Sequence, residues 1–196
     1  MNAVVEKQNL HSVSKRFPRR WIWTKKEYYK LIDIGFFNGK RGELIEGEII
    51  EFSLMKTPQA AAIGLFKNVL TKVLCESYDI RGQLPLNFSE ISEPEPDIAV
   101  VKGNPRDYLE SHPNTAELIV EISASTLNYD RNVKGKLYAR NNIQDYWIVD
   151  LRKRCIEVYR SPKADKYESM TTFSETDELS TLAMPENKLK VADLLP

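Results

Sequence analysis

The stretch ELIVEIS at residues 117–123 carries the clearest fold signal of this chain. The run is short, mostly apolar and rich in β-branched side chains, which is typical of a buried strand, and we expect that strand over residues 116–123. Side chains on a strand alternate between two faces, so the apolar residues at positions 118, 120 and 122 share one face. Glu121 then lies on the other face with Ile119 and Ser123. Because a buried carboxylate must be paired, protonated or bound to metal, Glu121 is a candidate functional residue.

A second strand signal, PDIAVV at residues 96–101, places a carboxylate at the mouth of an apolar run. Asp97 directly follows a proline, and burying its charge is costly unless that charge has a partner. If this strand and residues 116–123 are neighbours, Asp97 and Glu121 converge. Two carboxylates in a partly dry site repel each other, and a divalent cation relieves that repulsion. Hard oxygen ligands select Mg²⁺ (or Mn²⁺), with Mg²⁺ lying about 2.1 Å from each oxygen.

The converging pair has two interpretations. In a metal site, the ion would polarise a scissile phosphate and lower the pKa of a bound water, and a nearby lysine would orient or activate that water. In a structural network, Glu121 would instead form a salt bridge with an arginine or lysine. Paired carboxylates alone do not separate these two interpretations.

The rest of the chain mixes helices and strands irregularly. One helix begins with Thr24 as N-cap and Glu27 as its capping-box partner, and it stops at Gly35. A longer helix has Thr57 as N-cap and Pro58 at its first position, with apolar residues every three or four positions. The other expected elements are a strand pair over residues 43–51 with a turn at Gly47, strands over 80–88, 97–102, 145–151 and 155–160, a loop over 103–115, and a helix from Asn128 or Asp130 to Asn142. This pattern predicts an α/β (α+β) fold with one central mixed β-sheet flanked by helices.

The length of 196 residues fits one domain, which we expect over residues 21–196. Residues 1–20 are polar and basic without periodicity, and we expect a flexible segment there. Six lysines and arginines fall within residues 15–26, interleaved with aromatic side chains. They form either a phosphate-contacting arm or a solvated tail that leads into the first helix.

Charge and cysteine usage limit the class of protein. Lys plus Arg and Asp plus Glu both number 28, so no net charge demands a nucleic-acid partner. Cys75 and Cys155 are far apart without CxxC spacing, which favours a reducing compartment over a zinc ribbon or a disulfide framework. The lone histidines His11 and His112 predict no metal site. Because no run approaches the ~20 apolar residues of a membrane span and the N-terminus lacks the apolar core of a signal peptide, we expect a cytoplasmic protein.

Several motifs in a fixed order make the chain resemble a known family. In sequence order they are ELIEGEI at residues 43–49, Pro96-Asp97, Glu121, SAST at residues 123–126, Asp130, Lys134 and DYWIVD at residues 145–150. This order resembles the Uma-two family of restriction-endonuclease-like proteins in the PD-(D/E)XK nuclease superfamily. The resemblance runs from about Lys25 to Arg160 and implies a restriction-endonuclease-like core.

The resemblance also implies which residues act. Asp97 and Glu121 match the acidic metal ligands of the superfamily. The superfamily's lysine stands two residues after the second acidic residue, where this chain has Ser123 instead. Lys134, on the helix that follows, resembles a lysine that has moved there.

Two further residues complete this comparison. Glu46, or less readily Glu43, resembles the carboxylate that the family's first elements supply to the catalytic site. Lys136 lies about 200° further round an ideal helix than Lys134 and therefore faces elsewhere.

The activity implied is metal-dependent endonucleolytic hydrolysis of DNA phosphodiester bonds, with Mg²⁺ (or Mn²⁺) as cofactor. We also expect a homodimer, by analogy with enzymes of this type that cut both DNA strands. The alternative is a catalytically inactive nuclease-like scaffold that binds nucleic acid or protein. Ser123 and the zero net charge favour the scaffold, whereas the joint presence of Asp97, Glu121 and Lys134 favours the enzyme.

Overall fold

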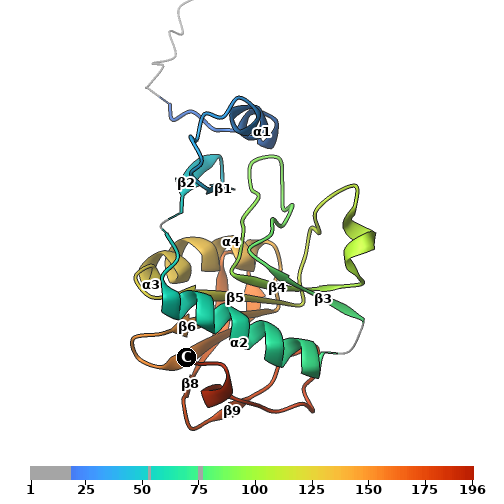
Figure 1. Cartoon of the computed structure of the whole chain (residues 1–196), viewed down its shortest axis with the longest axis vertical. Helices are drawn as coiled ribbons and strands as arrows, with labels where there is room; N and C mark the ends of the chain where they lie inside the picture. The colour runs from blue at the N-terminus through green and yellow to red at the C-terminus, as the bar shows by residue number, and fades with distance from the viewer. Residues whose placement is uncertain (1–18, 53, 75–76) are drawn as a thin grey trace, which may run out of the picture.

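The computed structural model describes residues 19–52, 54–74 and 77–196, and a six-stranded mixed sheet lies at its centre (Figure 1). The strand order is β3-β4-β5-β6-β7-β8, in which β5 and β6 are parallel and all other neighbours are antiparallel. The strands are β3 (Tyr78–Gly82), β4 (Ile98–Lys102), β5 (Leu118–Ser123), β6 (Asp145–Asp150), β7 (Cys155–Lys163) and β8 (Lys166–Ser174). The α+β class with a central mixed sheet is therefore confirmed.

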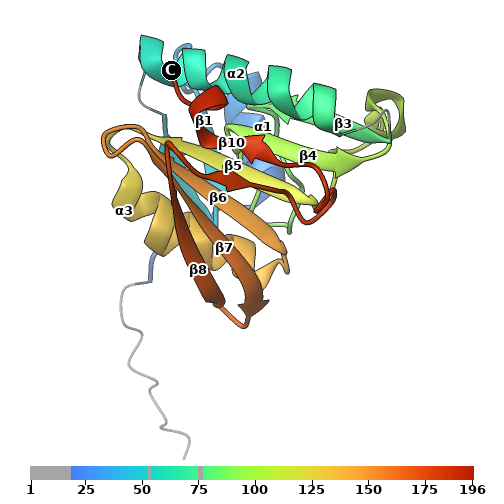
Figure 2. The ribbon, with the colours of Figure 1, turned by 90° about the horizontal axis from the view of Figure 1, so that it is seen from below.

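Helices cover both faces of this sheet (Figure 2). The long helix α2, Thr57–Val73, packs Phe66 against the apolar residues at the even-numbered positions of β5. The helix α4, Gly135–Arg140, packs Tyr138 on the opposite face. The alternation expected for β5 is confirmed, and it directs Glu121 toward the α4 side of the sheet.

A π-helical turn interrupts the helix that follows β5. The segment consists of α3 (Leu127–Tyr129), the π-turn η2 (Asp130–Lys134) and then α4. The N–H of Gly135 donates to the carbonyl of Asp130, which also accepts the hydroxyl of Tyr146 at 2.9 Å. Such turns insert one residue into a helix and often occur at functional sites. Both ends of this turn, Asp130 and Lys134, are buried.

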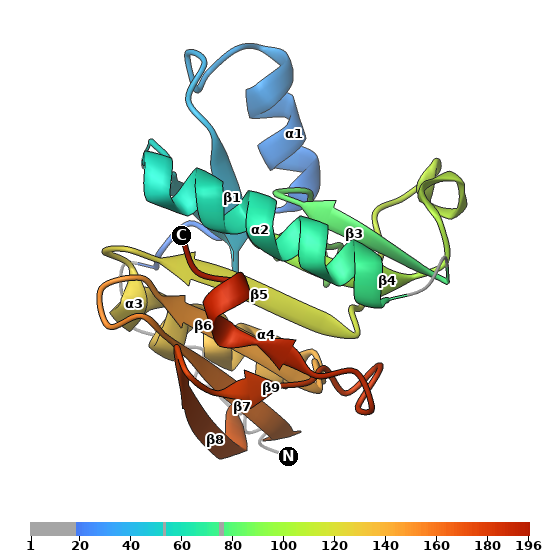
Figure 3. The ribbon, with the colours of Figure 1, turned by 60° about the horizontal axis from the view of Figure 1, so that its bottom comes forward.

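The N-terminal helix α1, Lys25–Asp33, lies at the end of the molecule beyond the sheet (Figure 3). Thr24 is its N-cap, and the side chains of Thr24 and Glu27 form the predicted capping box. The hydroxyl of Tyr28 donates to the carbonyl of Gly42 at 2.6 Å, so helix α1 is bonded to the hairpin that follows it.

That hairpin consists of β1 (Gly42–Ile45) and β2 (Glu48–Glu51). Its two turn residues, Glu46 and Gly47, both have positive φ, at 49° and 78°, as a tight two-residue hairpin turn requires. The turn predicted at Gly47 is therefore confirmed. The carbonyl of Leu44 accepts the N–H of Glu93 at 2.7 Å, which joins β1 to the loop that leads into β4.

Several predicted boundaries are wrong; for example, β7 runs to Lys163 and not to residue 160. The strand predicted over residues 80–88 is β3, which starts at Tyr78 and leaves the sheet at Gln83, where φ is 52°. Helix α2 includes Thr57 itself, and Lys56 is its N-cap. The remaining elements of the described ranges are η1 (Pro105–Tyr108), β9 (Glu178–Leu179), β10 (Leu189–Lys190) and η3 (Val191–Asp193).

Some expectations fall outside the described residues. They concern residues 1–18 of the segment predicted to be flexible, which include His11, and they concern Cys75. Within residues 19–52, 54–74 and 77–196, no helix has the length and apolar character needed to cross a membrane.

Candidate active site

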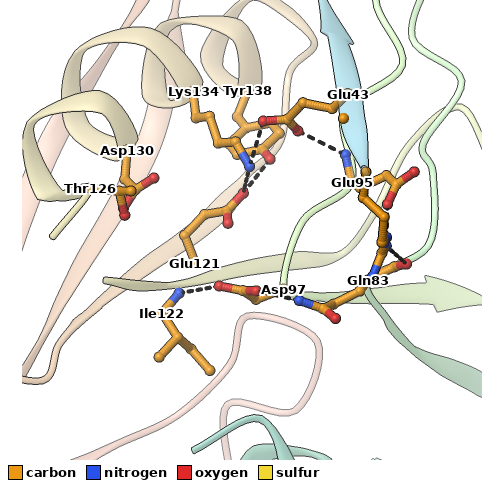
Figure 4. Close-up of polar contacts among 12 residues, drawn as sticks. Glu43, Gln83, Glu95, Asp97, Glu121, Ile122, Thr126, Asp130, Lys134 and Tyr138 are labelled. Carbon is orange, nitrogen blue, oxygen red and sulfur yellow. Dashed lines mark hydrogen bonds and ion pairs between the residues drawn. The ribbon is translucent and has the colours of Figure 1, made fainter. Parts of the chain in front are cut away.

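The two predicted carboxylates come from opposite positions of the antiparallel pair β4–β5, where Glu121 points toward Lys134 and Asp97 points toward Ile122 and Gln83 (Figure 4). Ile98 pairs with Val120, so continuing the register by one residue sets Asp97 opposite Glu121. Opposite residues of antiparallel strands lie on one face, with Cβ atoms about 4.5–5.5 Å apart. The two strands are thus neighbours, which is the condition under which Asp97 and Glu121 were expected to converge.

Asp97 is half-buried and is held at both carboxylate oxygens. Its Oδ2 accepts the backbone N–H of Ile122 at 2.8 Å, and its Oδ1 accepts the side-chain amide of Gln83 at 3.1 Å. The β4–β5 pairing ends at Val120, so the side chain of Asp97 takes the place of a partner strand for that N–H. Each carboxylate oxygen keeps a second lone pair that can serve a further ligand.

Glu121 is 4% exposed and lies beneath helix α4. Its Oε1 accepts both the ammonium of Lys134, at 3.0 Å, and the hydroxyl of Tyr138, at 2.6 Å. Burial raises the pKa of Glu121 to about 8, because removal from water disfavours the charged carboxylate. Lys134 opposes this shift, and the charge of Asp97 adds to it. A hydrogen bond to Oε2 is absent from the described part of the chain, so Oε2 is the oxygen left for a ligand.

Lys134 reaches the site from the π-turn and is 5% exposed. Its ammonium lies 3.0 Å from Glu121 and 3.2 Å from Glu43, and it sits 5.9 Å from the centre of the Phe52 ring. Burial acts to lower the pKa of Lys134, but the neighbouring carboxylates outweigh burial and raise that pKa well above its usual value. The lysine is therefore charged at neutral pH and acts as a hydrogen-bond donor.

Two glutamates of the β1–β2 hairpin, Glu46 and Glu43, were candidates for a further site carboxylate. The structure places Glu43 at the site and Glu46 away from it. Glu43 is 1% exposed, contacts Lys134, and accepts the N–H of Glu95 at 3.0 Å. Glu46 is exposed at the hairpin turn and pairs with Arg140 at 2.5 Å. The preference for Glu46 is thus not supported by its position. A buried glutamate within an apolar strand, the signal that singled out Glu121, could have identified Glu43.

The residues near Lys134 on this helical segment differ in exposure. Lys136 is exposed, so the prediction that it faces away from the site is confirmed. Asp130 is buried like Lys134, at the other end of the π-turn. The carboxylate of Asp130 accepts the hydroxyl of Thr126 at 2.8 Å, and burial raises its pKa. Ser123, which replaces the superfamily's lysine, lies beside Thr126.

Sequence reasoning missed two residues that contact the carboxylates directly. Tyr138 donates to Glu121, and it follows Lys134 by four residues on the same helical segment. That spacing places side chains on one helix face and could have identified Tyr138. Gln83 donates to Asp97. No sequence signal marked it, because its contact depends on strand register and on a left-handed backbone.

The donor set fits a Mg²⁺-type ion held by two carboxylates. In the described ranges, no cluster of three or more His, Cys, Asp or Glu side chains could hold a metal ion by itself. Mg²⁺ usually keeps several waters and is bound through one or two carboxylates together with substrate phosphates. Asp97 and Glu121, opposite each other with lone pairs to spare, match that requirement.

Comparison with known proteins agrees with this fold. A family model described as putative restriction endonuclease matches residues 26–192. A crystallised putative nuclease from Anabaena variabilis superposes with a TM-score of 0.65 at 21% identity, covering 87% of this chain and 96% of that one. Its fold is therefore the fold of this chain.

A weaker likeness is to the type IIG restriction endonuclease BpuSI. Its TM-score is 0.39 at 14% identity, over 59% of this chain and 14% of that one, which is too low to add to the fold assignment. No curated protein matches the chain.

Proposed function

Because this chain belongs to the Uma2 family of putative restriction endonucleases, we propose that it is a metal-dependent endonuclease that hydrolyses DNA phosphodiester bonds. The observation that carries the proposal is the register that sets Asp97 opposite Glu121, with Lys134 bonded to Glu121. Two opposed carboxylates with a buried lysine supply both a cation site and a fixed positive charge beside it.

In this proposal Asp97 and Glu121 hold Mg²⁺ or Mn²⁺. When bound, such an ion polarises the scissile phosphate and lowers the pKa of a bound water. Asp97 is already fixed in orientation by its bonds to Ile122 and Gln83. Tyr138 and Lys134 fix Oε1 of Glu121 in the same way, so the carboxylates need little rearrangement when they bind the ion.

Lys134 acts in this proposal through its charge and its protons. A lysine whose pKa is raised well above its usual value does not accept a proton from water at neutral pH. Its ammonium can instead donate to a phosphate oxygen and stabilise the negative charge that develops there during hydrolysis. Glu43 holds Lys134 from the side away from Glu121 and so sets the position of that charge.

A cleavage assay tests the proposal directly. The purified protein, incubated with supercoiled and linear DNA and with Mg²⁺ or Mn²⁺, is expected to convert both substrates to shorter or relaxed products. EDTA should stop the reaction, because Asp97 and Glu121 act through the ion. Cleavage that persists in EDTA, or no cleavage with either ion over a broad set of DNA sequences, would contradict the proposal.

Binding of Mn²⁺ is expected to strengthen as pH rises. Glu121 binds metal as a carboxylate, and because burial raises its pKa to about 8, a proton competes with the ion for Glu121 near neutral pH. The ion must displace that proton, so affinity should rise about tenfold per pH unit between about pH 6 and pH 8 and level off above. Calorimetry in buffers of different ionisation enthalpy should show about one proton released per ion. An affinity that stays constant over this range would contradict the assignment of Glu121.

One observation favours the inactive scaffold. Lys134 is fully buried between Glu121 and Glu43, as in a structural ion-pair network. In that case the wild-type protein would bind no Mn²⁺ at concentrations that activate nucleases, and any binding of DNA would be independent of divalent ions. The metal titration described above therefore separates the two functions.

A further inference from the structure

Gln83 lies just past the end of β3, next to Asp97, which directly precedes the neighbouring strand β4. Gly82 of β3 pairs with Ile98 of β4, so the next position along the register sets Gln83 opposite Asp97. Asp97 is in turn opposite Glu121. Gln83 directly after β3, Asp97 directly before β4 and Glu121 of β5 therefore follow one another at the edge of three neighbouring strands (Figure 4).

The backbone of Gln83 is arranged to aim its side chain along this row. Its φ is 52°, a left-handed conformation that is uncommon for a residue other than glycine and is favoured mainly by Asn, Asp and His. Its N–H donates to the carbonyls of Pro96 and Asp97, both at 3.2 Å, which fixes the backbone against the start of β4. The longer glutamine side chain spans the remaining distance and brings its amide to Asp97.

A hydrogen bond from a neutral amide, as Gln83 donates to Asp97, suits a metal-binding carboxylate, because such a carboxylate has to keep its negative charge. An ionised carboxylate only accepts hydrogen bonds, so the NH₂ group of Gln83 must face Oδ1 of Asp97. A neutral amide orients the carboxylate without neutralising it, whereas a lysine or arginine would compete with a metal ion. Within the described residues, Gln83 is the sole hydrogen-bond donor to Oδ1, and the Ile122 N–H is the sole donor to Oδ2.

We propose that Gln83 is a positioning residue that holds the carboxylate of Asp97 in the orientation required to bind a divalent metal ion. This inference rests on the proposed function, because it assumes that Asp97 is a metal ligand. Gln83 acts through Asp97 and touches neither the ion nor the substrate. Its removal should therefore weaken metal binding while leaving the fold intact.

The test is an Mn²⁺ titration of the full chain, followed by calorimetry or by electron paramagnetic resonance of the free ion. Gln83→Met keeps the length of the side chain and removes the donor, and we expect it to weaken Mn²⁺ binding about tenfold to a hundredfold at an unchanged Tm. Gln144→Met is the matched control, since the exposed amide of Gln144 bonds only within its own turn, to Asn142. This control should bind Mn²⁺ as the wild-type protein does.

If Gln83→Met binds Mn²⁺ as tightly as the wild-type protein, the positioning role is overturned, whatever the cleavage assay shows. If Gln83→Met does not fold, Mn²⁺ binding by Gln83→Asn is the deciding measurement. Asparagine tolerates the left-handed backbone, but its amide is one methylene too short to reach Asp97. Weak Mn²⁺ binding by this variant supports the role and unchanged binding overturns it. If the wild-type protein itself binds no Mn²⁺, the proposed function fails and this inference fails with it.

Discussion

Asp97→Asn is expected to abolish metal-dependent DNA cleavage and to leave the protein folded. The variant removes one of the two carboxylates proposed to hold the ion, and loss of several kcal/mol of charge stabilisation corresponds to about a thousandfold or more in rate. Mn²⁺ affinity should fall with the rate. Both quantities are measured on purified protein, by cleavage assay and by Mn²⁺ titration.

The fold should survive because the hydrogen bonds of Asp97 can be rebuilt. The Asn oxygen can accept the N–H of Ile122, and Gln83 can turn its amide so that its oxygen accepts from the Asn NH₂ group. Asp33→Asn, at an exposed position of α1, is the matched control and should cleave like the wild-type protein. If Asp97→Asn unfolds at ordinary temperature, Asp97 is a structural residue. If it folds and still cleaves, Asp97 is not a metal ligand.

Lys134→Met is expected to lose both activity and stability. Without the ammonium, the developing charge on the phosphate lacks its donor, which should lower the rate about a hundredfold to a thousandfold. Glu121 and Glu43 would also be left buried without their cation, at a cost of about 3–5 kcal/mol of unfolding free energy. Thermal unfolding and cleavage kinetics measure the two effects separately.

Added metal distinguishes a catalytic lysine from a purely structural one. A divalent ion bound at Glu121 supplies positive charge beside the carboxylates, so Mn²⁺ should raise the Tm of Lys134→Met more than that of the wild-type protein. The rate should stay low even when the ion is bound. Lys136→Met is the control, because Lys136 is exposed and faces away from the site. Equal cleavage by the Lys134 and Lys136 variants would contradict the role of Lys134.

Local strand pattern predicted the positions of two residues of the candidate site, Asp97 and Glu121. The alternation within residues 117–123 directed Glu121 to the face opposite α2, and the proline-flanked Asp97 marked the start of a neighbouring strand. Both inferences needed only local pattern, because the period of a strand is two and a buried carboxylate is costly. The capping box of Thr24 and Glu27 was predicted for the same reason, since its contacts span three residues.

The predictions that the structure does not support depend on contacts between residues far apart in the sequence. The choice of Glu46 over Glu43 was unsupported, because it required knowing which face of the β1–β2 hairpin meets Lys134. The end of β3 at Gln83 was missed because apolar residues continue through the loop that follows. The homodimer, the basic N-terminal segment and the cytoplasmic location stay predictions.

The proposed chemistry depends most on Asp97 and Glu121 sharing one divalent ion. A crystal soaked in Mn²⁺, with anomalous diffraction recorded at the manganese absorption edge, tests this directly. We expect one strong anomalous peak between the two carboxylates, within about 2.1–2.3 Å of an oxygen from each. Density that shows no peak there, with Lys134 still bridging Glu121 and Glu43, would contradict the account and favour a scaffold without this chemistry.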